Sequence, residues 1–229
     1  MFGAELQSSD LVATSYAAAT IATFSTSALS MLGLSWASER WRAPLALSAV
    51  ALLASAIAYL DASQVWMAVQ KMTAASRYIA WFTVQPMQVA AAYFFTRTSG
   101  PVPVGVFWRT TVAALLMVLS RYLGDAQVFN ATLAILLSIA FWLYILGEMY
   151  FGAMASAVRK ASPPIRFGYF WIRLIMTIGW AIYPILQFVD LVVGAGHGRS
   201  VIVLYTLSDL VNLITVSLIV LAVSGQERY

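Results

Sequence analysis

The sequence predicts an all-α membrane protein, a seven-transmembrane helix bundle. Of its 229 residues, 62% are hydrophobic and only 10% are charged, whereas a soluble domain carries about 25% charged residues. Apolar runs that reach the roughly 20 residues needed to cross a bilayer recur seven times along the chain. A soluble core of this size cannot hide so much apolar surface, so the bilayer must cover it.

The seven runs follow one another without a gap long enough for a further domain. They lie at residues 10–34, 44–68, 77–97, 103–122, 127–152, 166–193 and 200–224. The segments between them carry the charges, prolines and glycines that end helices. In order, these separators are Glu39–Arg42, Gln70–Lys71, Arg97–Pro101, Arg121–Asp125, Arg159–Pro164 and Gly194–Arg199. Residues 1–229 are therefore predicted to form a single domain.

Positive charge favours one side of the predicted bundle. The connections after spans 1, 3 and 5, with the C-terminus, hold Arg40, Arg42, Arg97, Arg159, Lys160 and Arg228. Those after spans 2, 4 and 6 hold Lys71 and Arg199, with Arg121 at a helix end. The positive-inside rule places the N-terminus outside and the C-terminus in the cytoplasm. We expect a multi-pass protein of a bacterial inner membrane, whose first helix acts as its own insertion signal.

Composition excludes several classes of function. The net charge of +4 is dispersed and forms no basic patch for nucleic acid. The absence of cysteine excludes disulfides and thiolate metal sites. The single histidine, His197, lies in a glycine-rich run and is expected to be a solvated loop residue. No nucleophile–base or metal-ligand pattern is visible, so we do not expect an enzyme.

Charged residues inside the predicted spans are costly and therefore suggest function. Asp209 must be paired or protonated, and Arg77 is its expected partner because both lie in the outer halves of their helices. Either a structural ion pair or part of a ligand site fits this arrangement. In the inner halves of spans 5 and 6, Glu148 and Arg173 are expected to form a structural bridge or an oligomer contact.

Two tryptophans, Trp81 and Trp180, lie several residues inside their spans. Such residues are more often packing or interface anchors. On different helices they can also form the walls of a flat apolar ligand site. Composition alone favours packing.

Several motifs, in the right order along the chain, resemble those of microbial rhodopsins, especially proteorhodopsins. The third-helix motif is Arg77-Tyr78-Ile79-Ala80-Trp81 followed by Pro86. The sixth-helix motif is Gly179-Trp180-Ala181-Ile182-Tyr183-Pro184. The seventh-helix motif is Tyr205-Thr206-Leu207-Ser208-Asp209-Leu210-Val211-Asn212, and Tyr122–Ala126 and Ala161–Pro163 also have counterparts.

The resemblance implies a role for each matching residue. Trp81 and Trp180 would enclose the polyene of retinal, and Tyr183 and Pro184 would belong to the same pocket. Asp209 would be a counter-ion to the Schiff base, linked to Arg77. Asp61 would lie near the position of a second-helix histidine, so that Arg77, Asp209 and Asp61 form a buried charge cluster.

The chemistry of this family is interrupted at three positions. Its retinal-binding lysine stands four residues after the seventh-helix aspartate, where this chain has Leu213. The only lysines, Lys71 and Lys160, are predicted loop residues. The proton acceptor and donor carboxylates of pumps are replaced by Ala80 and Ala91. No covalent cofactor is expected, and non-covalent retinal is conceivable without being expected.

The resulting hypothesis is a rhodopsin-like protein that does not pump protons. Its partners would be the lipid bilayer and other subunits, in a homo-oligomer or in a hetero-oligomer with another rhodopsin that it regulates. One alternative is a non-covalent binder of retinal or another polyene, acting as sensor or carrier. Another is a light-independent transporter or channel that uses Arg77, Gln85, Gln88, Asp209 and Asn212.

Overall fold

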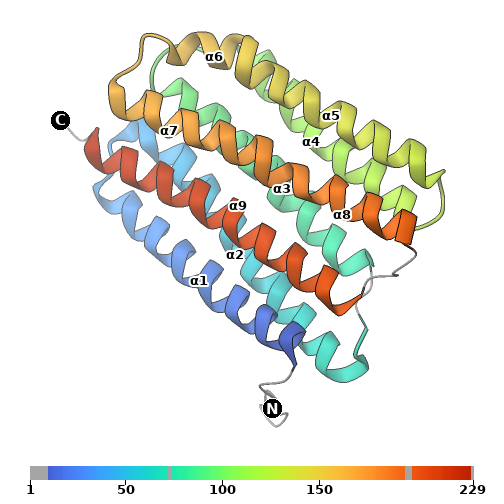
Figure 1. Cartoon of the computed structure of the whole chain (residues 1–229). Helices are drawn as coiled ribbons and strands as arrows, with labels where there is room; N and C mark the ends of the chain where they lie inside the picture. Colours follow the sequence, from blue (N-terminus) through green and yellow to red (C-terminus); the bar gives the residue numbers. More distant parts are fainter. Residues whose placement is uncertain (1–9, 72–73, 194–197, 228–229) are drawn as a thin grey trace.

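The computed structural model describes residues 10–71, 74–193 and 198–227, and the secondary structure of this part is entirely helical. The helices run roughly parallel in one bundle (Figure 1). Their bounds are α1 Leu11–Trp36, α2 Glu39–Val69, α3 Ala74–Arg97, α4 Val104–Asp125, α5 Ala131–Phe151, α6 Ala153–Val158, α7 Pro163–Leu174, η1 Ile175–Gly179, α8 Trp180–Val193 and α9 Arg199–Gln226.

Neighbours in the sequence pack side by side from α1 to α5, and the last span closes the bundle. Helix α9 contacts α1 and α2 on one side and α7 and α8 on the other, so it lies between the beginning of the chain and the sixth span (Figure 1). The sixth span is continuous but composite, because α7 passes through the π-helical turn η1 into α8. Seven crossings result, as the sequence predicts.

Six of the described helical segments are long and apolar enough to cross a membrane by composition alone, and α3 is not among them. The polar residues of α3 account for this. Arg77, Gln85 and Gln88 are each at most 7% exposed, so they face other helices rather than lipid. Helix α3 spans the bundle at its centre, where its lipid contact is small.

The predicted boundaries agree with the structure to within a few residues, except at the start of α2. Glu39–Arg42 was expected to be a connection, but it forms the first turn of α2. Trp41 is completely buried there and packs edge-on against Phe95 at 5.3 Å between ring centres. The indole, although flanked by charges, therefore anchors α2 to α3. The short helix α6 after α5 was not predicted.

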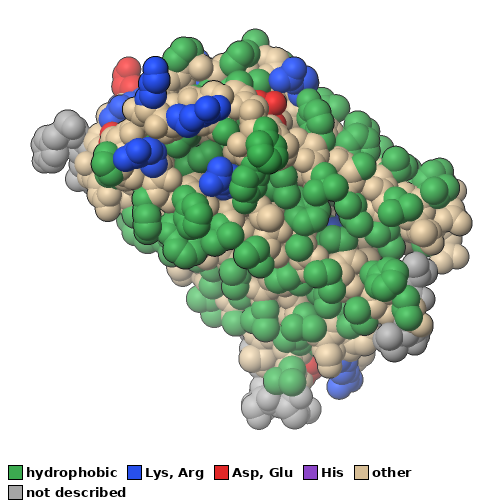
Figure 2. Space-filling model, turned by 45° about the horizontal axis from the view of Figure 1, so that its top comes forward, with side chains coloured by type: hydrophobic (Ala, Val, Ile, Leu, Met, Phe, Trp, Pro, Cys, Tyr) green, Lys and Arg blue, Asp and Glu red, His purple; other side chains and the backbone are tan. Residues whose placement is uncertain are grey.

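Basic side chains are concentrated at one end of the bundle. Figure 2 shows Lys and Arg gathered at the end where α6 and the C-terminus lie, with hydrophobic side chains along the rest of the visible face. The exposed basic residues of this end are Arg40, Arg42, Arg97, Arg109, Arg159, Lys160 and Arg166. Lys71 and Arg199 are exposed at the opposite end. The end that carries α6 and the C-terminus is therefore cytoplasmic, because it holds most of the basic residues. His197 and Arg228 lie outside the described residues.

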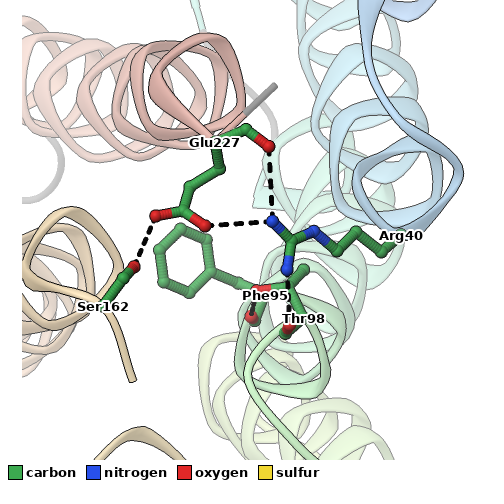
Figure 3. Close-up of polar contacts among 5 residues, drawn as sticks. All are labelled: Arg40, Phe95, Thr98, Ser162 and Glu227. Carbon is green, nitrogen blue, oxygen red and sulfur yellow. Dashed lines mark hydrogen bonds and ion pairs between the residues drawn. The ribbon is translucent and has the colours of Figure 1, made fainter. Parts of the chain in front are cut away.

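A hydrogen-bonded cluster, here named the cytoplasmic clamp, joins four helices (Figure 3). Arg40 donates to the Glu227 carboxylate at 3.0 Å and to its backbone carbonyl at 3.3 Å. The Ser162 hydroxyl donates to the other oxygen of the same carboxylate. Arg40 also reaches the carbonyl of Thr98 at 3.5 Å. The clamp ties the start of α2, the end of α3, the start of α7 and the end of α9.

At the outer end, Asp10 caps α1 and fastens it to α2. Its carboxylate accepts hydrogen bonds from the backbone N–H groups of Val12 and Ala13 at 3.1 and 3.2 Å. The Trp66 indole N–H donates to its other oxygen at 2.8 Å. A carboxylate at this position satisfies free helix donors and complements the helix dipole.

We expect the contribution of Asp10 to stability to disappear in acid. Partial burial raises the pKa of this carboxyl, but hydrogen bonds to Trp66 and the backbone outweigh it, and the pKa lies below the ordinary value of 3.8. A lowered folded-state pKa stabilises the protein above the unfolded pKa, and this stabilisation is lost as the pH falls through the folded pKa. The difference in melting temperature between wild type and Asp10→Asn should therefore shrink on acidification below about pH 4. A difference that is constant with pH would contradict the assignment.

Candidate functional site

The interior holds a cavity of about 40 Å³ between α2, α3, α8 and α9. Trp81 of α3 and Trp180 of α8, both 3% exposed, belong to its walls together with Tyr183. The three aromatic residues that the sequence predicts at one site are thus brought together. Polar side chains line part of this cavity, so it can hold ordered water.

The carboxylate of Asp209, on α9, is the centre of the polar network in this cavity. It accepts hydrogen bonds from the hydroxyls of Tyr59 and Tyr183, each at 2.5 Å, and from the Trp81 indole at 3.3 Å. Asn212, one turn further along α9, donates to the Tyr183 hydroxyl at 3.0 Å. Side chains from α2, α3, α8 and α9 are therefore joined through one carboxylate.

Arg77 does not form the expected direct ion pair with Asp209. None of the ion pairs among the described residues joins the two, and the Arg77 guanidinium lies over the Tyr205 ring, 4.1 Å from its centre. Both residues nevertheless line the same cavity. The tyrosine and tryptophan donors occupy the carboxylate, and Arg77 lies against the faces of the Tyr205 and Trp81 rings.

The prediction that Asp61 belongs to this buried charge cluster is wrong. Asp61 is exposed on α2, and its neighbours Ala62 and Ser63 are the buried residues of that turn. Tyr59 is the α2 side chain that reaches Asp209. With Asp61 outside, no second carboxylate of α2 shares the cavity with Asp209.

The three positions at which the rhodopsin pattern is interrupted differ in their relation to the cavity. Leu213, 6% exposed, and Ala80 line it, whereas Ala91 is buried elsewhere in α3. Lys71 and Lys160 are exposed and lie outside the helices, as predicted. No lysine amine of the chain therefore borders the cavity, and nothing at Leu213 can form a Schiff base.

A second, smaller cavity of about 10 Å³ lies next to the first and shares Gln85, Trp180 and Tyr183 with it. Pro184, predicted as part of the pocket, borders this smaller space, as does Arg121 of α4. Arg121 was expected at a helix end beside the membrane surface. It is instead 2% exposed, with its guanidinium 5.1 Å from the centre of the Trp81 ring and 5.6 Å from that of Tyr183.

The expected bridge between Glu148 and Arg173 is not formed. Glu148 pairs with Arg109 of α4 at 3.6 Å and accepts a hydrogen bond from the backbone N–H of Ala153 at 2.6 Å. Arg173 lies over the Tyr150 ring, 4.2 Å from its centre. Glu148 is thus used to fasten α5 to α4 and to the start of α6.

A further polar group at the outer end was not predicted. The Asp125 carboxylate accepts hydrogen bonds from Tyr78 at 2.6 Å and from Gln187 at 3.1 Å. The sequence carries no signal for this contact, because Asp125 is the last residue of α4 and a carboxylate at a helix end ordinarily reaches water. Tyr59 could have been found, because it is one of few polar groups in the middle of an apolar run.

Comparisons with known proteins agree with this fold and site. Residues 10–225 match the family model described as bacteriorhodopsin-like protein. The chain is 26% identical over 226 residues to the green-light absorbing proteorhodopsin of Gamma-proteobacterium EBAC31A08, covering 98% of this chain and 91% of the relative. It is 27% identical to the blue-light absorbing proteorhodopsin of Gamma-proteobacterium Hot 75m4, covering 98% and 90%.

Solved structures show the same architecture. The blue light-absorbing proteorhodopsin from Med12 superposes with a TM-score of 0.80 at 24% identity, covering 95% of this chain and 100% of the other. Xanthorhodopsin, described as a light-driven ion pump with dual chromophore, superposes with a TM-score of 0.82 at 15% identity, covering 95% and 93%. With a family match over nearly its whole length, the chain belongs to the bacteriorhodopsin-like protein family and is a multi-pass membrane protein.

Proposed function

We propose that this chain is a member of the family that neither holds retinal covalently nor pumps protons, and that it acts in the membrane as a subunit or regulator of an oligomer. The observation that carries the first part is Leu213. It lines the cavity one helical turn from Asp209, the position that the resemblance assigns to the lysine. Proton transfer across the bundle also needs titratable groups along a path, and Ala80 and Ala91 supply none.

The residues present do not fit covalently attached retinal. Attachment needs an amine, and the cavity is bordered by none. The buried Arg121 guanidinium also stands beside Trp81, one wall of this cavity. The relatives' names describe light absorption and, for xanthorhodopsin, ion pumping; neither activity is carried over to this chain.

The outer surface supports the second part of the proposal. Asp61 and Gln64 are exposed one turn apart on α2, and Asp61 lies about 12 Å along the helix from its outer end. A carboxylate that faces lipid at this depth is unfavourable. Contact with a polar group of another subunit would remove it from lipid, which fits a subunit interface along α2.

The absence of a Schiff base is tested by adding all-trans retinal to purified protein, with a light-absorbing proteorhodopsin as positive control. We expect no visible band shifted from free retinal and no retinyl adduct after borohydride reduction. Illuminated vesicles should show no change in pH. An adduct on Lys71 or Lys160 that accompanies light-driven pumping would refute the proposal.

The addition of all-trans retinal also tests a second candidate function, the non-covalent binding of a polyene between Trp81 and Trp180. Both tryptophans line the cavity. A shifted band that reverts on acid denaturation and is lost in Trp180→Ala would favour this function over the first.

Assembly is tested through Asp61. We expect the protein, alone or co-expressed with a pumping rhodopsin that carries the only affinity tag, to purify in mild detergent as an oligomer. Asp61→Leu should weaken that association at least several-fold, while the matched surface variant Leu60→Ala, also exposed on α2, should leave it unchanged. Monomeric protein under all these conditions would count against the assembly role.

A further inference from the structure

Arg121 is a cation held inside the bundle, and two of its guanidinium donor atoms have no hydrogen-bond acceptor. Its side chain is 2% exposed, and its Nε and Nη2 atoms are buried with no hydrogen-bond partner. None of the ion pairs among the described residues includes it. Buried donors without an acceptor are strongly unfavourable, and arginine cannot lose its proton.

The carboxylates of the region are occupied by other donors. Asp125 is held by Tyr78 and Gln187, and Asp209 by the donors described above. The faces of Trp81 and Tyr183 attract the Arg121 guanidinium, but they carry no net charge. Asp125, one turn further along α4, supplies negative charge nearby, but the Nε and Nη2 atoms of Arg121 still lack a hydrogen-bond acceptor.

The smaller cavity lies where such an acceptor would bind. It is bordered by Arg121, Gln85, Ser138, Trp142 and Met117, among others. The Oε1 atom of Gln85 is buried without a partner, and rotation of this amide would turn its N–H₂ donors toward the space. A volume of about 10 Å³ is that of about one water-sized particle, and the flexible Met117 can yield slightly.

We propose that this cavity binds one small monovalent anion of the halide class, chloride in a cell, with Arg121 as the principal ligand and Gln85 as a second donor. The ion accepts hydrogen bonds from Arg121 and fixes the faces of Trp81 and Tyr183 against it, between α3, α4 and α8. The site is independent of the assembly role and of any chromophore. A divalent or larger anion such as sulfate does not fit the space.

Thermal unfolding of the detergent-purified protein tests the site. Melting is compared in sodium chloride, bromide, sulfate and gluconate at equal ionic strength, so that screening is the same. A ligand that binds only the folded state raises the melting temperature. We expect a saturable rise with chloride and bromide alone. Arg121→Gln should lose it, and the control Arg173→Gln, whose guanidinium lies over Tyr150 away from both cavities, should keep it.

Because Arg121→Gln can also affect folding, a measurement on the wild type is added. Crystals grown in bromide should show an anomalous scattering peak beside the Arg121 guanidinium, and Gln85→Leu should weaken the halide-dependent rise without abolishing it. Equal melting in all four salts, or bromide peaks only elsewhere, would overturn the proposal and leave water as the occupant of the cavity.

Discussion

Gly179→Ala should be among the most damaging single substitutions in this protein. Gly179 ends the π-helical turn η1 and faces Asn212 of α9. A Cβ atom at this position would overlap the Oδ1 atom of Asn212 and lie 2.8 Å from its Cγ. The Asn212 side chain cannot move freely, because it donates to Tyr183. Overpacking of this kind costs about 1–3 kcal/mol, and loss of the Asn212 hydrogen bond adds about 1 kcal/mol.

The measurement is the free energy of unfolding of detergent-solubilised protein, from its denaturant midpoint. Gly147→Ala in α5 is the matched control, because a Cβ there meets nothing within 4 Å; it should be neutral or stabilising by up to about 1 kcal/mol. Adding Asn212→Ala to Gly179→Ala should recover part of the loss, giving a coupling energy between the two sites. Additive effects would show that the clash is not the cause.

Asp209→Leu should be comparably destabilising, by about 3–5 kcal/mol, the usual cost of removing one member of a buried charged network. Leucine leaves the hydroxyls of Tyr59 and Tyr183 and the Trp81 indole without their acceptor. Each unsatisfied donor inside the bundle is costly because no bulk water replaces the lost partner.

Asp209→Asn, which keeps an acceptor oxygen at the same place, should cost clearly less than Asp209→Leu. Tyr59→Phe, which removes one donor and leaves the carboxylate with two others, should also be the milder change. Denaturant midpoints of the three variants give the ranking. If Asp209→Leu were as stable as wild type, the carboxylate would not be holding α2, α3, α8 and α9 together.

The sequence was sufficient to predict the spans, the orientation and the aromatic walls of the site. Trp81, Trp180 and Tyr183 lie in motifs whose resemblance to those of microbial rhodopsins implies one pocket, and the structure brings them together. The seven apolar runs needed no tertiary information, because the thickness of the bilayer fixes their length.

The errors share one physical cause. Helix α2 is apolar around most of its circumference, so the sequence does not reveal which face is turned inward; Tyr59 points into the bundle and Asp61 out of it. Arg121 was assigned to the surface because arginine near a helix end ordinarily reaches water. The partner of Glu148 depended on which of two nearby arginines lies on the facing side of its helix. Side-chain direction, rather than secondary structure, is what the sequence left undetermined.

The cytoplasmic clamp has a consequence for biosynthesis. Arg40 and Glu227 are 187 residues apart in the chain, and Glu227 follows the last helix. At about 5–20 residues per second, a ribosome needs roughly ten to forty seconds between them. Throughout that interval the nascent bundle can insert and pack its helices, but its cytoplasmic end stays unfastened. The clamp can close only after Glu227 has been synthesised, so a product truncated before this residue lacks the group that completes it.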